Sequence, residues 1–199
     1  AVCDIDSVLR GKYLRADKFA KIKETGFGFC RVIFDWDMED KCYQLDDEHN
    51  KKTGFPDLIA KIDMNTLRKI PWDNNTPFVL ADLWQNDSTP FSLCPRQILK
   101  SVISRCQDLG YNPLVGCEYE WFNFKESPES LREKNFQNLT PLTPGMYGYS
   151  ILKTTDPSSY MSELQDCCEQ FNIPLEALHT ETGPGVYEAA ISAAPALEA

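Results

Sequence analysis

A Gly-Pro-Gly turn near the C-terminal end of the chain limits its possible folds more than any other sequence feature. Residues 182–185, Thr-Gly-Pro-Gly, separate two strand-like segments, PLEALHTE and VYEAAISA. Because Gly and Pro favour a tight reversal of the backbone, the two segments are predicted to lie side by side as a hairpin. Such a return would bring Glu181 and Glu188 close together, although they are separated along the chain.

Another strand-like segment, GCEYEWFNF at residues 116–124, carries two glutamates at alternate positions. Side chains alternate between the two faces of a strand, so Glu118 and Glu120 share one face. Two carboxylates about 6–7 Å apart repel each other by roughly 2–3 kcal/mol at an effective dielectric constant near 20. No basic residue lies between Asn112 and Lys125 to offset this repulsion. The pair therefore indicates either a face open to water or a bound hard cation.

The two pairs of glutamates together favour the bound cation. An all-oxygen site suited to Mg²⁺ or Mn²⁺ could be formed by Glu118, Glu120, Glu181 and Glu188. The absence of cysteines at ligand spacing beside these residues argues against zinc. His179 is either a further ligand or a hydrogen-bonded residue of the strand, and the residues themselves leave both interpretations open.

The charge of the chain excludes some classes of partner. Thirty acidic and 20 basic residues give a formal net charge of −10, which argues against binding to nucleic acid. Residues 154–199 contain eight acidic residues and no Lys or Arg, so Glu181 and Glu188 need a cation from elsewhere. No apolar run approaches the roughly 18 residues that span a bilayer, so we expect no membrane partner and a cytoplasmic location. The eight cysteines contain no CxxC pair and are expected to be reduced, although their number alone would allow a disulfide framework.

The periodicity predicts an α+β protein with a change of pattern near residue 93. The first part is predicted to contain a hairpin turned at Asp6-Ser7, a helix at 16–26, strands at 29–34 and 78–84, and an irregular acidic loop at 35–57. The second part is predicted to contain a helix at 95–109, strands at 113–124 and 147–153, a surface excursion at 125–145, a helix from Asp156, and the C-terminal hairpin. The apolar face of the helix at 95–109 would consist of Ile98, Leu99, Val102, Ile103, Cys106 and Leu109.

Eight separated segments of the chain resemble, in the same order, the class I glutamine synthetase superfamily. They are DIDSVLRGKYL, GFGFC, FDWD, TGFPD, LCPRQIL, GCEYEWF, LTPGMYGYS and HTETGPGVYE. The resemblance covers essentially the whole chain. It implies a β-grasp amino-terminal domain at residues 1–92, followed at residues 93–199 by the first half of a catalytic domain with a curved antiparallel sheet and helices.

The resemblance also implies an activity, ATP-dependent ligation of glutamate to ammonia or a small amine through γ-glutamyl phosphate, supported by Mg²⁺ or Mn²⁺. Residue by residue, Glu120, Glu181 and Glu188 match the ligands of the metal nearer glutamate. Glu118 matches a ligand of the metal nearer the ATP phosphates. Glu176 matches a residue that contacts the nucleotide.

The family also forms rings in which an aspartate of one subunit reaches the active site of its neighbour. Asp35 or Asp37, in FDWD, is the counterpart that the resemblance implies, and each could instead be an ordinary loop residue. The chain departs from the family at Val186, where many members carry glutamine, and at Ser7, where glycine is common.

The second half of the family's catalytic domain has no counterpart in this sequence. We therefore expect the natural chain to continue past Ala199 and these 199 residues to be inactive alone. Two other hypotheses remain, a non-catalytic assembly protein resembling lengsin and a short binding module. Retention of all four mapped glutamates favours the enzyme.

Overall fold

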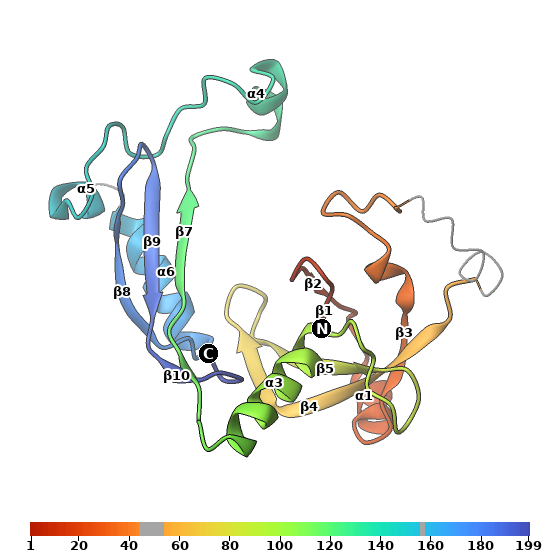
Figure 1. Ribbon diagram of the computed structural model, residues 1–199. Coiled ribbons are helices and arrows are strands. Elements are labelled where there is room, and N and C mark those ends of the chain that lie inside the picture. Colours follow the sequence, from red (N-terminus) through yellow and green to blue (C-terminus); the bar gives the residue numbers. More distant parts are fainter. Residues whose placement is uncertain (44–53, 156–157) are drawn as a thin grey trace. The chain divides into compact units, whose positions relative to one another are not determined.

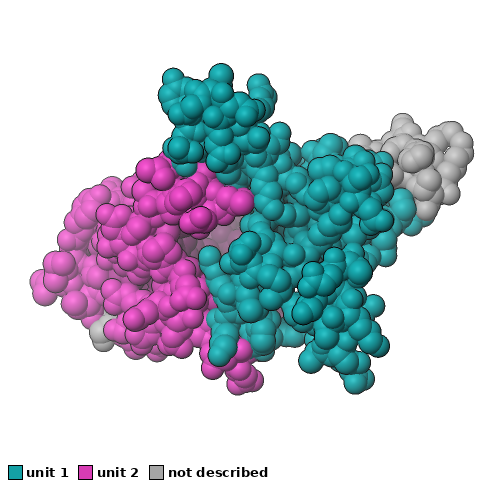
Figure 2. Space-filling model, turned by 90° about the horizontal axis from the view of Figure 1, so that it is seen from below, with its two compact units in different colours: residues 1–69, 76–113 teal, residues 70–75, 114–199 magenta. Residues whose placement is uncertain are grey.

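The computed structural model describes residues 1–43, 54–155 and 158–199, which form two compact units (Figures 1 and 2). Unit 1 comprises Ala1–Lys69 and Thr76–Pro113, and unit 2 comprises Ile70–Asn75 and Leu114–Ala199. Both units combine helices with small sheets, in agreement with the predicted α+β class. The division between them falls after Pro113, so the helix that follows residue 93 clusters with unit 1.

Unit 1 is built on a three-stranded sheet. Its elements are β1 (Val2–Cys3), β2 (Leu9–Arg10), α1 (Ala16–Ile22), β3 (Phe27–Cys30), the 3₁₀ helix η1 (Arg31–Phe34), β4 (Asp57–Ile70), β5 (Thr76–Trp84) and α3 (Pro95–Asp108). The sheet has the order β3-β4-β5, and β1 pairs antiparallel with β2 as the predicted hairpin. The carbonyl of Ala1 accepts a hydrogen bond from the N–H of Ala81, which joins the start of the chain to β5.

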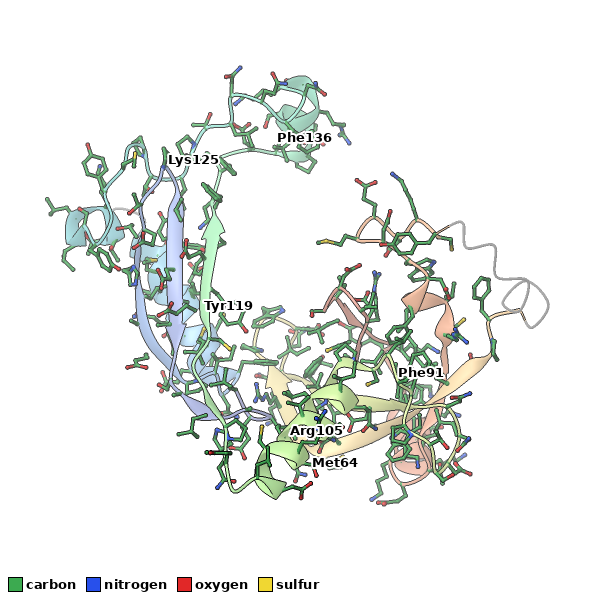
Figure 3. All side chains as sticks on the ribbon, in the orientation of Figure 1. Met64, Phe91, Arg105, Tyr119, Lys125 and Phe136 are labelled. Atoms are coloured by element: carbon green, nitrogen blue, oxygen red, sulfur yellow. The ribbon has the colours of Figure 1, made fainter. Side chains whose placement is uncertain are left out.

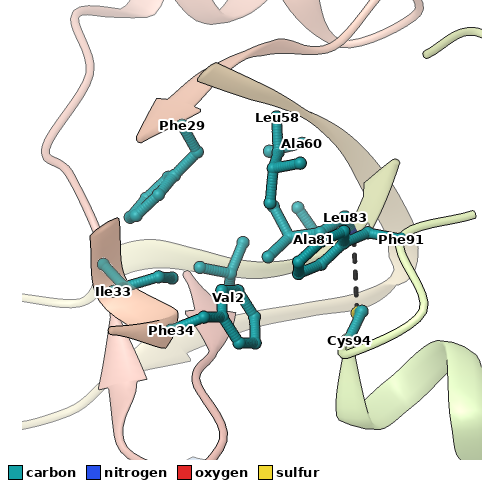
Figure 4. Packing of buried hydrophobic residues seen from close by; sticks show 10 residues of the cluster. All are labelled: Val2, Phe29, Ile33, Phe34, Leu58, Ala60, Ala81, Leu83, Phe91 and Cys94. Carbon is teal, nitrogen blue, oxygen red and sulfur yellow. Dashed lines mark hydrogen bonds between the residues drawn. The ribbon is translucent and has the colours of Figure 1, made fainter. Parts of the chain in front are cut away.

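Ten buried residues contributed by all three strands and by the segments around them form the apolar core of unit 1 (Figure 4). They are Val2, Phe29, Ile33, Phe34, Leu58, Ala60, Ala81, Leu83, Phe91 and Cys94. The rings of Phe34 and Phe91 meet edge to face, with centroids 4.9 Å apart. Burial of each large side chain stabilises the fold by about 1.5–3 kcal/mol, so these contacts account for the packing of η1 against the sheet.

Ion pairs attach helix α3 to the sheet of unit 1. The Arg96 guanidinium lies 2.6 Å from Asp63 on β4 and 2.9 Å from Asp82 on β5, and Lys100 also contacts Asp82. Arg96 and Lys100 are one helical turn apart, so the charged face of α3 meets the sheet. The helix itself was predicted correctly, but the expected burial of its apolar face is wrong: Ile98 and Val102 are about half exposed, and none of the residues of α3 is buried.

Unit 2 contains the C-terminal hairpin. Its elements are β6 (Leu114–Val115), β7 (Glu118–Phe122), α4 (Pro128–Glu133), α5 (Ile151–Thr155), α6 (Ser158–Gln170), β8 (Leu175–Thr180), β9 (Val186–Ile191) and β10 (Ala194–Pro195). A three-stranded sheet has the order β7-β9-β8, and β10 pairs with β6. The hairpin of β8 and β9 around the Gly-Pro-Gly turn was predicted correctly. The two residues that were expected to begin the second helix, 156 and 157, lie outside the described residues.

Several strand boundaries differ from the prediction. The strand expected at 29–34 ends at Cys30 and continues as η1. The single strand expected at 113–124 is divided into β6 and β7, because residues 116–117 belong to neither. Strand β4 was missed: it is long and mixes charged with apolar residues, so it shows neither a clean alternation nor an apolar run.

The strand predicted at 147–153 is wrong, because this segment contains helix α5. Ser150 precedes the helix, and its hydroxyl accepts a hydrogen bond from the N–H of Lys153. This is the contact of an N-terminal helix cap. The N–H of Thr154 donates to the carbonyl of Ser150 and continues the turn. Ser150, directly before Ile-Leu-Lys, therefore indicated the start of a helix. The apolar and aromatic residues of the segment favoured a strand instead, and this signal was missed.

Candidate metal centre

The sheet of unit 2 has one face packed against helix α6 and one face that carries the predicted ligands. Trp121 and Asn123 both donate hydrogen bonds to the hydroxyl of Tyr160 on α6, each at 2.9 Å. The Trp121 ring also stacks on the buried ring of Tyr187. Figure 1 shows α6 against this sheet. Because successive side chains of a strand point to alternate faces, Glu120 lies on the face opposite to α6. We call this face of the sheet the open face.

Strand register brings the predicted ligands together on the open face. Glu120 of β7 lies directly opposite Glu188 of β9, and Glu188 lies opposite His179 of β8. Directly opposite residues of antiparallel strands have Cβ atoms about 4.5–5.5 Å apart. Glu118 lies two positions before Glu120 and therefore faces the same way. The open face thus collects at least three carboxylates and one imidazole from three strands.

The Gly-Pro-Gly turn places Glu181 beside Glu188. The N–H of Glu181 donates to the carbonyl of Val186 at 2.9 Å, which closes the hairpin. Gly185 has φ +74°, and a Cβ at this position would lie 2.5 Å from the carbonyl oxygen of Asn123. Only glycine fits this approach without displacing the neighbouring backbone. The turn chemistry that was read from the sequence is therefore what holds the two glutamates together.

Among the residues that the structure describes, one group has the geometry of a metal site. Potential ligand atoms of His179, Glu181 and Glu188 all lie within 4.8 Å of one another. The imidazole Nε2 of His179 is 3.9 Å from the carboxylate of Glu188. The donor set of two carboxylates and one imidazole fits a divalent cation, and the imidazole makes it differ from the all-oxygen site that the sequence predicts. The carboxylates of Glu118 and Glu120 are exposed and lie outside this group of three.

Tyr149 borders the group of three and was not selected by the sequence reasoning. Its ring packs against the imidazole of His179, with centroids 4.6 Å apart. The pKa of Tyr149 is raised, chiefly by the charge of Glu181 and by the hydrogen bond between the two side chains, with smaller effects of burial, Glu188 and Glu118. Its φ of +59° is unusual for a residue with a side chain. The only sequence signal was its place in the motif LTPGMYGYS.

Hydrogen bonds keep Glu181 ionised. The N–H of Thr182 donates to its carboxylate at 2.6 Å, and this bond is the main reason that the pKa of Glu181 is lowered. Further contributions come from the hydroxyl of Thr182, from Tyr149 and from His179. A carboxylate that stays ionised in this way is a ready ligand for a cation.

The other predicted site residues are not members of the group of three. Glu176 is exposed at an irregularity in β8. Asp35 and Asp37 belong to unit 1, where the acidic loop is described only for residues 35–43 and 54–57. Asp35 is buried, and within the described chain its Oδ2 has no hydrogen-bond partner. Asp37 accepts hydrogen bonds from the N–H groups of Glu39 and Lys41, and it therefore stabilises a local turn.

Comparison with known proteins identifies the family. The family described as glutamine synthetase, catalytic domain, matches residues 92–199, more than half of the chain. The chain belongs to the glutamine synthetase family. Type-1 glutamine synthetase 2 of Dictyostelium discoideum is 47% identical over 195 residues, which are 98% of this chain and 37% of that protein. Glutamate–isopropylamine ligase of a Pseudomonas species is 31% identical over 197 residues, 98% of this chain and 43% of that protein.

The comparison with solved structures shows a similar fold. A GmaS complex with ADP superimposes with a TM-score of 0.74 at 22% identity, covering 98% of this chain and 41% of that one. The chain spans about two fifths of the length of the curated relatives named above. In the described parts of the chain, no helix is both long and apolar enough to cross a membrane.

Proposed function

We propose that this chain forms part of an ATP-dependent ligase that joins the γ-carboxylate of glutamate to ammonia or an amine. The observation that carries the proposal is the cluster of Glu181, Glu188 and His179 on the open face, opposite Glu120, in a member of the glutamine synthetase family. Relatives named for glutamine synthesis and for glutamate–isopropylamine ligation support this class of reaction.

The reaction has two balanced steps. A γ-carboxylate oxygen of glutamate bonds to the γ-phosphorus of ATP, and the bond from that phosphorus to the bridging oxygen of ADP breaks. The amine nitrogen then bonds to the carbon of the γ-carboxyl group, the bond between that carbon and the phosphate oxygen breaks, and phosphate leaves while the amine loses a proton. Both steps gather anionic oxygens in one place, so they need positive charge nearby.

The residues of the open face could hold the cations that supply this positive charge. Mg²⁺ or Mn²⁺, when bound, would neutralise the phosphate oxygens and polarise the phosphorus. We assign Glu120, Glu181 and Glu188 to one ion and Glu118 to a second. Thr182 and Tyr149 hold the carboxylate of Glu181 in place through hydrogen bonds. Trp121, anchored to Tyr160 beneath the sheet, fixes the strand that presents Glu120.

Further parts of the proposal rest on family resemblance. Residues 1–92 are assigned to a β-grasp domain and residues 93–199 to a catalytic domain that other residues complete. Glu176 is assigned to the nucleotide, and Asp35 or Asp37 to deprotonation of the acceptor in a neighbouring subunit of a ring-shaped homo-oligomer. A cytoplasmic location completes the proposal.

The test combines metal binding with catalysis. Mn²⁺ binding to the 199-residue chain can be measured from the loss of the electron paramagnetic resonance signal of free Mn²⁺. The affinity for Mn²⁺ is expected to fall at least tenfold in Glu188→Gln. The matched control, Glu163→Gln on the exposed side of α6, should bind Mn²⁺ as the wild type does.

In the full-length gene product, phosphate release from ATP should require both glutamate and an amine, and Glu120→Ala should abolish it without changing the oligomer. Metal binding with no phosphate release for any amine would instead favour the lengsin-like scaffold. Unchanged turnover in Glu120→Ala would remove the ligand assignment.

A further inference from the structure

A buried threonine joins the outer edge of strand β8 to the segment that precedes helix α5. Thr180 lies between His179 and Glu181 in the chain and is only 3% exposed. β8 is an outer strand of the β7-β9-β8 sheet, so every second N–H and C=O of the strand points away from β9. The carbonyl of Thr180 accepts a hydrogen bond from the N–H of Tyr149 at 2.8 Å. The two segments are therefore joined through their backbones at this point.

The hydroxyl of Thr180 forms two more hydrogen bonds with the same segment. It donates to the carbonyl of Tyr147 at 2.9 Å. It also accepts from the N–H of Ser150 at 3.2 Å. Together with the bond to its carbonyl, Thr180 thus holds Tyr149 itself and a residue on either side of it. Because the threonine is buried, a partner that lost one of these bonds could not readily replace it with water.

The backbone of Tyr149 has a conformation that needs such support. Its φ of +59° lies in the left-handed region, which residues with a side chain rarely adopt. Conformations of this kind persist where surrounding contacts fix them, and they are common at functional sites. Helix α5, which follows, contacts β8, and Figure 3 shows the side chains around α5 at this edge of the sheet. The hydrogen bonds to β8 therefore fix the direction in which the side chain of Tyr149 leaves the backbone.

The side chain that is held in this way reaches the candidate metal centre. The ring of Tyr149 packs against the imidazole of His179, with centroids 4.6 Å apart and planes inclined by 30°. The phenol hydroxyl is hydrogen-bonded to the carboxylate of Glu181. Tyr149 therefore contacts two of the three potential ligands of the group.

We propose that Thr180 is a positioning residue for the candidate metal centre. Its hydroxyl holds the segment around Tyr149 in place, and Tyr149 in turn keeps His179 and Glu181 in the arrangement that binds the cation. Thr180 points to the other face of the sheet from its two neighbours, so it acts only through Tyr149. Ligands that are already arranged bind more tightly than ligands that must be ordered on binding. This inference rests on the metal centre of the proposed function.

Mn²⁺ titration of the 199-residue chain, measured from the electron paramagnetic resonance signal of free Mn²⁺, tests the inference. Thr180→Val keeps the shape of the side chain and removes the hydroxyl, and it should lower the affinity for Mn²⁺ about fivefold, the effect of losing one hydrogen bond. Thr180→Ser keeps the hydroxyl and should bind Mn²⁺ nearly as the wild type does. The matched control is Thr143→Val, which removes another buried hydroxyl of unit 2, one that accepts a hydrogen bond from Tyr187. This control should leave the affinity for Mn²⁺ unchanged.

A double variant separates positioning from a general loss of stability. Tyr149→Ala should lower the affinity for Mn²⁺ by at least about fivefold, because two ligands lose their contact with the ring and the hydroxyl. Adding Thr180→Val to it should cause no further loss, because the threonine acts only through the tyrosine. Tyr149 is 68% exposed, so its alanine variant is expected to fold and tests the inference even if Thr180→Val does not fold.

Three results would overturn the inference while leaving the metal centre intact. The first is wild-type affinity for Mn²⁺ in Thr180→Val or in Tyr149→Ala. The second is an equal loss in Thr180→Ser and Thr180→Val, which would exclude a role of the hydroxyl. The third is a double variant in which the two losses multiply, because Thr180 would then act independently of Tyr149. A wild-type chain that does not bind Mn²⁺ would remove the metal centre of the proposed function, and the inference with it.

Discussion

Replacement of Gly185 by alanine tests whether the tight turn holds the candidate metal centre together. An alanine at φ +74° costs about 1–2 kcal/mol, because its Cβ crowds the backbone in the left-handed region. The Cβ would also lie 2.5 Å from the carbonyl oxygen of Asn123, so that oxygen must move. The carbonyl oxygen of Asn123 accepts a hydrogen bond from the N–H of Leu142 at 2.8 Å. The N–H of Asn123 donates a hydrogen bond to the carbonyl oxygen of Gly185, also at 2.8 Å. Weakening one or both hydrogen bonds adds about 1 kcal/mol each, for a total of about 2–4 kcal/mol.

Urea unfolding followed by circular dichroism measures this cost. At an m-value of about 2 kcal/mol/M, the midpoint of Gly185→Ala should fall by about 1–2 M. Gly110→Ala is the matched control, because Gly110 also has a positive φ, +84°, but nothing lies within 4 Å of its added Cβ. The urea midpoint of this control should fall by only about 0.5–1 M. Mn²⁺ affinity should fall in Gly185→Ala alone, because only that turn connects Glu181 with Glu188. Equal midpoint shifts in the two variants would refute the reasoning.

Two further predictions concern charged contacts. Hydrogen bonds from Lys134 first, and then from Ser130 and the backbone of Thr140, lower the pKa of Glu126 from 4.5 to about 2. The ionised form is thus stabilised by folding, so its contribution is complete above pH 4.5 and is lost as the pH falls toward 2. The difference in thermal midpoint between wild type and Glu126→Gln should shrink over this interval, and a constant difference would contradict the assignment. Arg96→Met should destabilise unit 1 by about 3–5 kcal/mol, because it leaves largely buried aspartates without their main partner. The exposed Arg15→Met is its control, and a similar small loss of urea stability in both variants would disprove this role of Arg96.

The sequence predicted best where local chemistry decides the structure. Pro95 at the start of α3 and the Gly-Pro-Gly turn after β8 act within a few residues, and both elements formed as expected. The alternation around Glu120 was also sufficient to place the glutamates on one face, because a strand has only two faces. Their role as metal ligands remains a prediction.

The failures came from interactions between distant parts of the chain. The apolar face of α3 was expected to be buried, but Arg96 and Lys100 turn the opposite face toward aspartates on β4 and β5, a pairing that no local pattern reveals. Helix α5 was taken for a strand because the cap provided by Ser150 carried less weight than the aromatic residues before it. Tyr149 was missed because its contact with His179 depends on how two separate segments fold together.

The position of Trp121 has a practical consequence for experiments on this protein. Strand β7 carries Glu120 on one side and, one residue later, an indole stacked on Tyr187 on the other. An ion that draws the carboxylates together would also strain the strand that carries the indole. The fluorescence emission of Trp121 should therefore change when a cation binds. Phenylalanine substitutions at the other three tryptophans, Trp36, Trp72 and Trp84, would leave a single built-in fluorophore that reports cation binding optically, with no added label.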